Sequence, residues 1–265
     1  MTETGSIGID QLASFALETI RKVGDSAMEY FAKGNPKVKF DNPLVTEAEL
    51  KLVQRFQAEV QSEFPEHQIF GDGPLKEGYT HGEKGLLWVY DALDGVANYQ
   101  AGIPVWGTSV ALYENFWPVL GVFYMPATGD IYHARAGEKA FWGDKKIEIP
   151  NQEEVNNESV LLTYSRFNDH YETTFPGKIR NFGCTAAHIC YVARGRAEAA
   201  IVANASYRDL AAARIILEAA GGQLLTIDGE NFYPNEYMEK RRIDKHVIAL
   251  PRGSYEAFSV YLDEK

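Results

Sequence analysis

The chain has 265 residues, of which 45% are hydrophobic and 24% charged, a composition typical of a globular protein with a sizeable core and not of a disordered one. Its 26 lysines and arginines against 37 aspartates and glutamates give a net charge of −11, which argues against sequence-independent binding to nucleic acid or to an anionic membrane. The sequence shows no signal-peptide pattern and no apolar run of the ~20 residues that a membrane span needs, so we expect a cytoplasmic protein.

The first half of the chain is predicted to hold two helices followed by a sheet. Apolar residues recur at helical spacing over 12–31 and again over 50–64, where Thr46 and Glu49 fit a capping box. From Gln68 onward, short β-branched and aromatic runs separated by Gly or Pro are typical of strands. The expected strands are 86–90, 108–113, 119–124, 131–134 and 146–149.

The second half is predicted to alternate strands with helices, which indicates an α/β unit. A polar segment over 150–158 separates the halves, so we expect two domains, 1–150 and 151–265. Cys184 and Cys190 would lie about 9 Å apart on a helix, which predicts reduced thiols. The expected strands are 160–164, 179–182, 199–203, 223–227 and 247–250, and the expected helices are 185–194, 210–220 and 255–262.

Two acids at the end of a buried-looking strand are the most informative feature. Asp91 and Asp94 are followed by Gly95, which lets the backbone turn so that several N–H groups can point at one place. Carboxylate oxygens at such a turn suit a hard cation such as Mg²⁺. A solvated, Asp-rich turn is the alternative.

Two further acids stand at similar junctions. Asp72 follows a short apolar run, and Asp209 stands at the predicted start of a helix. Each has a purely structural alternative, because Asp72 could only form a turn and Asp209 could only cap its helix. Together with Asp91 and Asp94 they predict one acidic centre.

These motifs resemble the inositol monophosphatase family over most of the chain. Two further runs, 121–126 and 136–141, are similar to the family's central hairpins. The family's W-x-x-D-P-[IL]-D-G-T-x-N-[FY] signature is matched by Trp88, Asp91, Leu93, Asp94, Gly95, Asn98 and Tyr99. Its W-D-x-A-A-x-x-[IL]-x-x-E-A-G-G signature is matched by Asp209, Ala211, Ala212, Ile215 or Ile216, Ala219, Gly221 and Gly222.

The resemblance implies an α/β fold, an alternating α-β-α-β-α sandwich of the sugar-phosphatase type, and a Mg²⁺-dependent phosphoric monoester hydrolase. It implies catalytic roles for Asp72, Asp91 and Asp94, with two or three Mg²⁺ ions, or Mn²⁺, held between the domains. The implied metal ligands are Asp72, Asp91, Leu93 through its carbonyl, Asp94 and Asp209. The implied phosphate-binding groups are the N–H groups of Gly95, Val96 and Ala97 and the helix N-terminus near Thr185.

The departures from the family pattern bear on activity and substrate. Asp72 is shorter than the family's Glu, and Val96 replaces a Thr whose hydroxyl would orient the attacking water. Val202 stands where the family has an acid that contacts inositol, which makes inositol a doubtful substrate, and Arg208 replaces a Trp. Glu49 stands where the family carries an acid for a third metal.

Three functional hypotheses therefore stay open at the level of sequence. The first is a phosphatase that acts on a small phosphorylated metabolite. The second is a nucleotide or sugar phosphatase of the same superfamily, and the third is a weak or inactive protein that binds metal and phosphate and regulates a partner. The resemblance also implies a homodimer. We interpret His188 as a packing or surface residue and the run 239–242 as a solvated surface segment.

Overall fold

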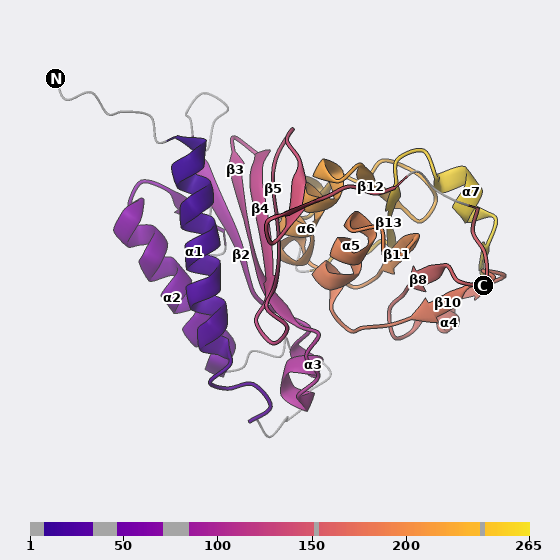
Figure 1. Cartoon of the computed structure of the whole chain (residues 1–265), viewed down its shortest axis with the longest axis horizontal. Helices are drawn as coiled ribbons and strands as arrows, with labels where there is room; N and C mark the ends of the chain where they lie inside the picture. Colours follow the sequence, from indigo (N-terminus) through magenta and orange to yellow (C-terminus); the bar gives the residue numbers. More distant parts are fainter. Residues whose placement is uncertain (1–7, 34–46, 71–84, 151–153, 239–241) are drawn as a thin grey trace.

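The computed structural model describes residues 8–33, 47–70, 85–150, 154–238 and 242–265, which form alternating layers of helix and sheet (Figure 1). One helix layer covers the outer face of a first sheet, a second lies between that sheet and a second sheet, and short helices lie beyond. The expected α-β-α-β-α sandwich is confirmed. The helices are α1 (Ile9–Ala27) and α2 (Glu47–Glu63), then α5 (Thr185–Ala193) and α6 (Tyr207–Ala219), then α4 (Phe167–His170) and α7 (Tyr255–Ser259).

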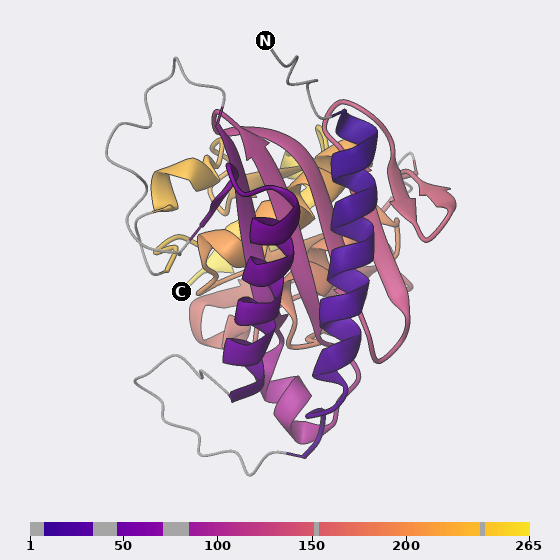
Figure 2. The same ribbon diagram turned by 90° about the vertical axis from the view of Figure 1, so that its left-hand side faces the viewer.

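The outer helix layer follows from the apolar spacing of the sequence. Helices α1 and α2 lie across the same face of the first sheet (Figure 2), and α1 buries Leu12, Ala16 and Ile20 against it. The prediction that the first helix reaches residue 31 is wrong. The Ala27 carbonyl accepts a hydrogen bond from the Tyr99 hydroxyl at 2.6 Å, and the chain leaves the helix there.

The first sheet has seven strands in chain order within the described residues, and only its first pair is parallel. Its central strands bury side chains on both faces because a helix layer covers each face. The strands are β1 (Gln68–Ile69), β2 (Leu86–Asp94), β3 (Gly107–Glu114), β4 (Trp117–Met125), β5 (Asp130–Arg135), β6 (Ala140–Trp142) and β7 (Lys145–Ile147).

The second sheet has the order β10-β8-β11-β13-β12 in the part of the chain that the structure describes. Its β10, β8 and β11 are parallel, and β13 runs antiparallel to both of its neighbours. The division into two domains near residue 150 stays a prediction. The strands are β8 (Val160–Leu162), β10 (Lys178–Arg180), β11 (Ala199–Val202), β12 (Gly222–Thr226) and β13 (Val247–Pro251).

Several short elements were not predicted. The chain ends on a strand that pairs with a second short strand, so the predicted helix over 255–262 is wrong beyond Ser259. The Tyr261 carbonyl accepts the Thr174 N–H at 3.1 Å and the Thr173 hydroxyl at 2.8 Å, long-range contacts that helical spacing cannot show. These elements are α3 (Val96–Ala101), β9 (Tyr171–Thr173), β14 (Leu262–Glu264) and the 3-10 helix η1 (Pro234–Tyr237).

A glycine on β4 lets the middle helix layer approach the first sheet. A Cβ atom added to Gly121 would lie 2.7 Å from the carbonyl oxygen of Ala212 and 3.1 Å from its Cα on α6. Any larger residue would therefore push α6 away from the sheet. Since Asp209 stands in the first turn of α6, this close contact helps to set its distance from β2.

The structure bears on the predicted state of the cysteines and on the possibility of a membrane span. Cys184 and Cys190 are both buried and free, which confirms the prediction that they form no disulfide. Among the described helices, none is long and apolar enough to cross a membrane.

Candidate active site

The end of β2 presents two carboxylates to the same side of the sheet. Asp91 pairs with Ser109 and Asp94 pairs with Gly107, so three steps on β2 match two steps on β3. Residues three apart on a regular strand face opposite sides, and this bulge corrects the mismatch. The Asp91 carbonyl is held by the Thr108 hydroxyl, 3.0 Å away.

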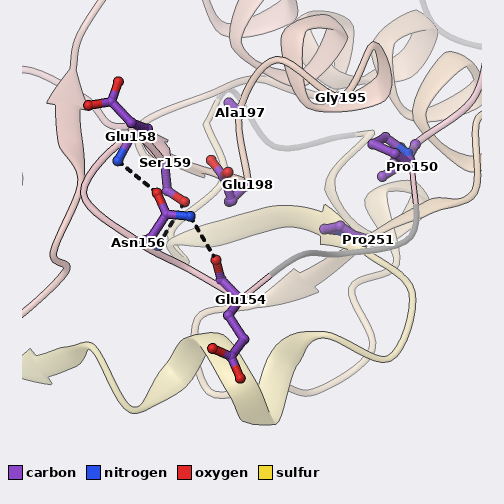
Figure 3. Close-up of a pocket in the computed structure, with 10 residues that line it drawn as sticks. Pro150, Glu154, Asn156, Glu158, Ser159, Gly195, Ala197, Glu198 and Pro251 are labelled. Atoms are coloured by element: carbon purple, nitrogen blue, oxygen red, sulfur yellow. Dashed lines mark hydrogen bonds between the residues drawn. The ribbon is translucent and has the colours of Figure 1, made fainter.

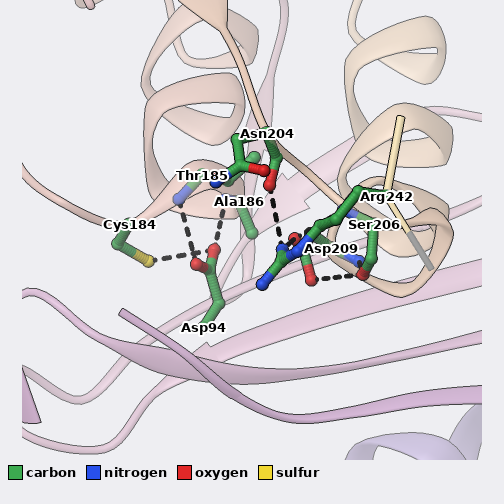
Figure 4. A network of polar contacts seen from close by, with 8 residues as sticks. All are labelled: Asp94, Cys184, Thr185, Ala186, Asn204, Ser206, Asp209 and Arg242. Atoms are coloured by element: carbon green, nitrogen blue, oxygen red, sulfur yellow. Dashed lines mark hydrogen bonds and ion pairs between the residues drawn. The ribbon is translucent and has the colours of Figure 1, made fainter. Parts of the chain in front are cut away.

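Asp94 reaches across to the N-terminus of α5 (Figure 4). Its carboxylate accepts the N–H groups of Thr185, at 3.1 Å, and Ala186, at 2.5 Å, and the Cys184 thiol at 3.2 Å. A negative charge at this end of a helix is stabilised by unpaired N–H groups and by the helix dipole. The bonds connect the first sheet to the middle helix layer.

Asp209 belongs to the first turn of α6, where Ser206 is the N-cap. The Asp209 carboxylate accepts the Ser206 N–H at 2.8 Å, and the Asp209 N–H donates to the Ser206 hydroxyl oxygen at 3.4 Å, which forms a capping box. The carboxylate also accepts the Ser206 hydroxyl at 2.7 Å. Asp209 is therefore not the N-cap that the structural alternative proposed. Arg242 makes a further contact with this carboxylate: its Nη1 lies 3.5 Å from Asp209 Oδ2.

Arg242 is exposed, as predicted for the run over 239–242, but it also makes contacts that the sequence did not indicate. Its guanidinium lies beside Asp209 and donates to the Asn204 carbonyl at 2.9 Å. Residues 239–241 lie outside the described part of the chain. Only the packing of the segment beside α6 could place this side chain, since nothing in the local pattern distinguishes Arg242 from its neighbours.

The three carboxylates repel one another. Burial, followed by the charges of Asp209 and Asp94, raises the pKa of Asp91 well above its usual range. Burial and the charge of Asp209 raise the pKa of Asp94 to about 6, although its bonds to the start of α5 act in the opposite direction. Arg208 offsets a part of the repulsion on Asp91. Without a cation, ionisation of all three carboxyl groups together is therefore unfavourable.

The side chains present fit a hard divalent cation. Asp91 Oδ2 is buried and has no hydrogen-bond partner among the described residues, and carboxylate oxygens are the ligands that Mg²⁺ prefers. No three Asp, Glu, His or Cys side chains in the described ranges converge on one point, because Asp94 and Asp209 bond to helix N-termini. Asp72, expected as a further ligand, lies outside the described residues.

The predicted phosphate-binding groups fall into two sets. Gly95, Val96 and Ala97 stand at the start of α3, where N–H groups have no partner within the helix. Gly95 has a φ of +86°, and a Cβ there would lie 3.0 Å from the Val105 carbonyl, so glycine is required. The Thr185 N–H is instead bonded to Asp94, and its use for phosphate stays a prediction that requires Asp94 to turn away.

The remaining predicted positions differ in how they relate to the centre. The Leu93 side chain is buried in the core between the first sheet and helices α1 and α2, which leaves only its main chain for a ligand role. Val202 is buried and pairs with Val247 in the second sheet, so its side chain belongs to the core. The charge of Glu49 raises the pKa of Asp91, which places Glu49 near the centre; Thr46, its predicted capping partner, lies outside the described residues.

Asn98, to which the sequence assigned no role, joins the two halves of the chain. It is buried, and its amide donates to the Val105 carbonyl and to the Phe182 carbonyl, just before α5. Gly183 packs against the same amide, where a Cβ would approach it to 3.0 Å. Asn98 therefore fixes the loop whose end carries the bonds to Asp94.

His188 is confirmed as a packing residue. It is buried in α5, and its Nε2 accepts the Phe182 N–H at 2.9 Å, which requires the neutral ring with its proton on Nδ1. Burial lowers the pKa of His188 to about 4.

This buried histidine predicts a pH-dependent stability. Between pH 6.5 and 4 the unfolded chain binds a proton at His188 that the folded chain excludes, so stability falls as the pH falls through this window. The loss should total about 3 kcal/mol. We expect His188→Gln, which can still accept the Phe182 N–H, to flatten this part of the profile in urea unfolding. Parallel profiles for both proteins would contradict the assignment.

A cavity of about 270 Å³ lies apart from the acidic centre (Figure 3). No predicted site residue lines it. Its polar groups bond to protein: Asn156 donates to the Glu154 carbonyl at 3.2 Å, and Glu198 accepts the Val160 N–H at 2.6 Å. We therefore assign the chemistry to the carboxylates on β2 and α6 and not to this cavity.

The chain is similar to known proteins in both sequence and fold. The sequence profile described as the inositol monophosphatase family matches residues 9–251. A histidinol-phosphatase of Chlorobaculum parvum is 29% identical over 217 residues, which cover 78% of this chain and 82% of that protein. Inositol monophosphatase 1 of Bos taurus is 27% identical over 239 residues, 83% of each chain. A solved IMPase structure from Thermotoga maritima has a TM-score of 0.77, with 25% identity and 94% of each chain covered.

The layered fold and the acids at the end of β2 and the start of α6 define a class: an α/β protein with an acidic centre suited to a divalent cation. The profile match covers nearly the whole chain. The chain therefore belongs to the inositol monophosphatase family, whose members are phosphatases that depend on metal, typically Mg²⁺.

Proposed function

We propose that this chain hydrolyses the phosphate monoester of a small metabolite, with Mg²⁺ held by Asp91, Asp94 and Asp209. The observation that carries the proposal is the buried Asp91 oxygen without a hydrogen-bond partner among the described residues, beside two further carboxylates that raise its pKa. Buried like charges are costly unless a cation offsets them.

Each group then has a physical role. A bound Mg²⁺ activates water at neutral pH and stabilises charge on the leaving oxygen. Asp91 and Asp94 hold the cation from the sheet and Asp209 holds it from α6, with the Leu93 carbonyl as a further ligand. The N–H groups of Gly95, Val96 and Ala97 bind the phosphate oxygens. Asp72, on the chain before β2, completes the ligand set and orients the water.

Metal binding is the first test of the proposal. Calorimetry should detect Mg²⁺ or Mn²⁺ binding to the purified chain, and the number of ions, two or three, follows from the stoichiometry. Asp94→Asn and Asp209→Asn should each weaken that binding greatly. If both variants bind metal as well as the natural chain does, the ligand assignment is wrong.

The substrate is proposed to be a small phosphorylated alcohol other than an inositol phosphate. The related proteins are a histidinol-phosphatase and inositol monophosphatases, so family membership alone leaves the alcohol open. Val202 lies in the core and offers no acceptor for ring hydroxyls, and unpaired buried polar groups cost about 1–3 kcal/mol each. Phosphate release from a panel of sugar, inositol and nucleotide phosphates tests this, and a clear lead for an inositol phosphate would contradict it.

The natural chain is expected to be a slow phosphatase. Val96 lacks a hydroxyl and Asp72 is a short acid, so the attacking water has fewer partners, an effect typically worth about 10²–10⁴-fold. Val96→Thr combined with Asp72→Glu should raise kcat at least about tenfold and change metal affinity much less. The gains should be non-additive because both groups act on one water.

The double change Val96→Thr with Asp72→Glu also distinguishes a phosphatase from the hypothesis of an inactive protein that binds metal and phosphate. A protein that only binds metal and phosphate to regulate a partner would release no phosphate before or after the double change. Ordinary turnover of about 1–10³ s⁻¹ without any gain would mean that another group orients the water.

Assembly and location complete the proposal. We expect a homodimer in the cytoplasm, as the resemblance implies, with no nucleic acid or membrane partner. Light scattering coupled to gel filtration tests the assembly, and fluorescence microscopy of the tagged chain tests the location.

A further inference from the structure

One basic side chain lies at the acidic centre and is not used by the proposed reaction. Arg242 Nη1 donates to the Asn204 carbonyl at 2.9 Å and lies 3.5 Å from Asp209 Oδ2. Figure 4 shows its guanidinium beside Asp209, on the side of Asp209 that faces Asp94. In a chain with a net charge of −11, Arg242 is a cation beside the carboxylates of the centre.

The backbone holds Arg242 in this place. The next residue, Ile243, is buried, and its N–H donates to the Ala205 carbonyl at 2.8 Å. The neighbouring Asn204 has a φ of +58°, which Asn tolerates better than most residues and which accompanies the contact of its carbonyl with Arg242. Arg242 is thus held through the backbone of Ile243 and through the contact of its own guanidinium with the Asn204 carbonyl.

Its interactions with protein leave most of its donors available. A guanidinium has five N–H donors, and within the described residues the Arg242 side chain contacts only Asn204 and Asp209. The 3.5 Å contact exceeds the usual length of an N–H···O hydrogen bond, and Asp209 already accepts two bonds from Ser206. About half of the Arg242 side chain, 49%, is exposed. The geometry suits a ligand more than a structural ion pair.

We propose that Arg242 binds a second anionic group, a carboxylate or a phosphate, on the alcohol part of the substrate. This inference rests on the proposed phosphatase function. The buried Val202 gives a ring of hydroxyls no acceptor, whereas Arg242 gives an anion several donors in a fixed fork. The substrate class is therefore a phosphate ester with a further negative charge.

The test compares matched ligands that differ only in the second charge. One pair is β-glycerophosphate and the phosphoglycerate with its phosphate on the same carbon, which adds a carboxylate. The other is an adenosine monophosphate and the bisphosphate that adds a distant phosphate. For each ligand we would measure kcat and KM with Mg²⁺, and binding by calorimetry, in the natural chain, Arg242→Gln and Arg242→Lys. Arg252→Gln is the control, since it removes an exposed arginine at the other end of β13.

Arg242→Gln should raise KM for the ligand with the second anion at least about tenfold, as expected for a lost charge-assisted contact. The kcat for that ligand, and both kcat and KM for the ligand without the second anion, should change much less. Arg242→Lys should recover a part of this loss, and the pair that responds identifies carboxylate or phosphate. Arg252→Gln should leave the preference intact.

Three outcomes would overturn the inference. If Arg242→Gln weakened the binding of both ligands of a pair equally and also weakened inhibition by inorganic phosphate, Arg242 would bind the phosphate that is cleaved. If Arg242→Gln weakened the binding of both ligands equally and lowered the unfolding temperature, the role of Arg242 would be structural. No preference in binding would mean that no second anion is recognised. If no ligand is hydrolysed, the proposed function fails, but the calorimetric comparison still decides the role of Arg242.

Discussion

Asp91→Asn is expected to raise the unfolding temperature of the metal-free protein while it lowers phosphatase activity at least about a hundredfold. The change removes a carboxyl group whose ionisation is opposed by burial and by the charges of Asp209 and Asp94, and whose Oδ2 has no hydrogen-bond partner in the described structure. The temperature should rise by about 2–4 °C for each kcal/mol of repulsion relieved. Activity should fall further than the 10–100-fold typical of residues that only support a metal ligand.

Differential scanning fluorimetry without metal and phosphate release at saturating Mg²⁺ measure the two effects. Asp144→Asn removes the same charge from an exposed turn between β6 and β7 and should change neither value. Lower stability in Asp91→Asn would show that the Asp91 carboxylate has a partner that our description of the site lacks.

Asn98→Ala is expected to lower the free energy of unfolding by about 2–4 kcal/mol. The change leaves the carbonyls of Val105 and Phe182 without their donor, and each unsatisfied buried group costs about 1–3 kcal/mol. It also removes the link between the start of α3 and the loop before α5. Activity should fall as well, because that loop leads to the N–H groups that hold Asp94.

Urea unfolding measures the cost, with Asn157→Ala as the control because Asn157 is exposed. The control should lie within about 0.5 kcal/mol of the natural chain. A loss below about 1 kcal/mol for Asn98→Ala would mean that water replaces the amide at both carbonyls.

The local pattern of the sequence determined the main elements and the chemical character of the centre. Apolar residues at helical spacing are enough to predict α1 and α2, and β-branched and aromatic runs separated by Gly or Pro are enough to predict β3 to β5. Each of these signals depends on neighbours a few residues away. The D-x-x-D-G run at Asp91 and Asp94 indicated a cation site for the same reason: strand, acids and glycine are adjacent in the chain. Asp209 stood out by its place at the predicted start of a helix, and the family resemblance implied that it binds metal together with Asp91 and Asp94.

Only the tertiary structure decided how these groups meet. The bulge in β2 depends on its pairing with β3, and the bonds of Asp94 depend on α5 about 90 residues later. Arg242 reaches Asp209 because the next residue, Ile243, is bonded to Ala205 just before α6. The same applies to Asn98 and to the short strand that ends the chain. Such contacts join segments far apart in sequence, and their geometry is set by how helices and sheets pack, for which local periodicity carries no information.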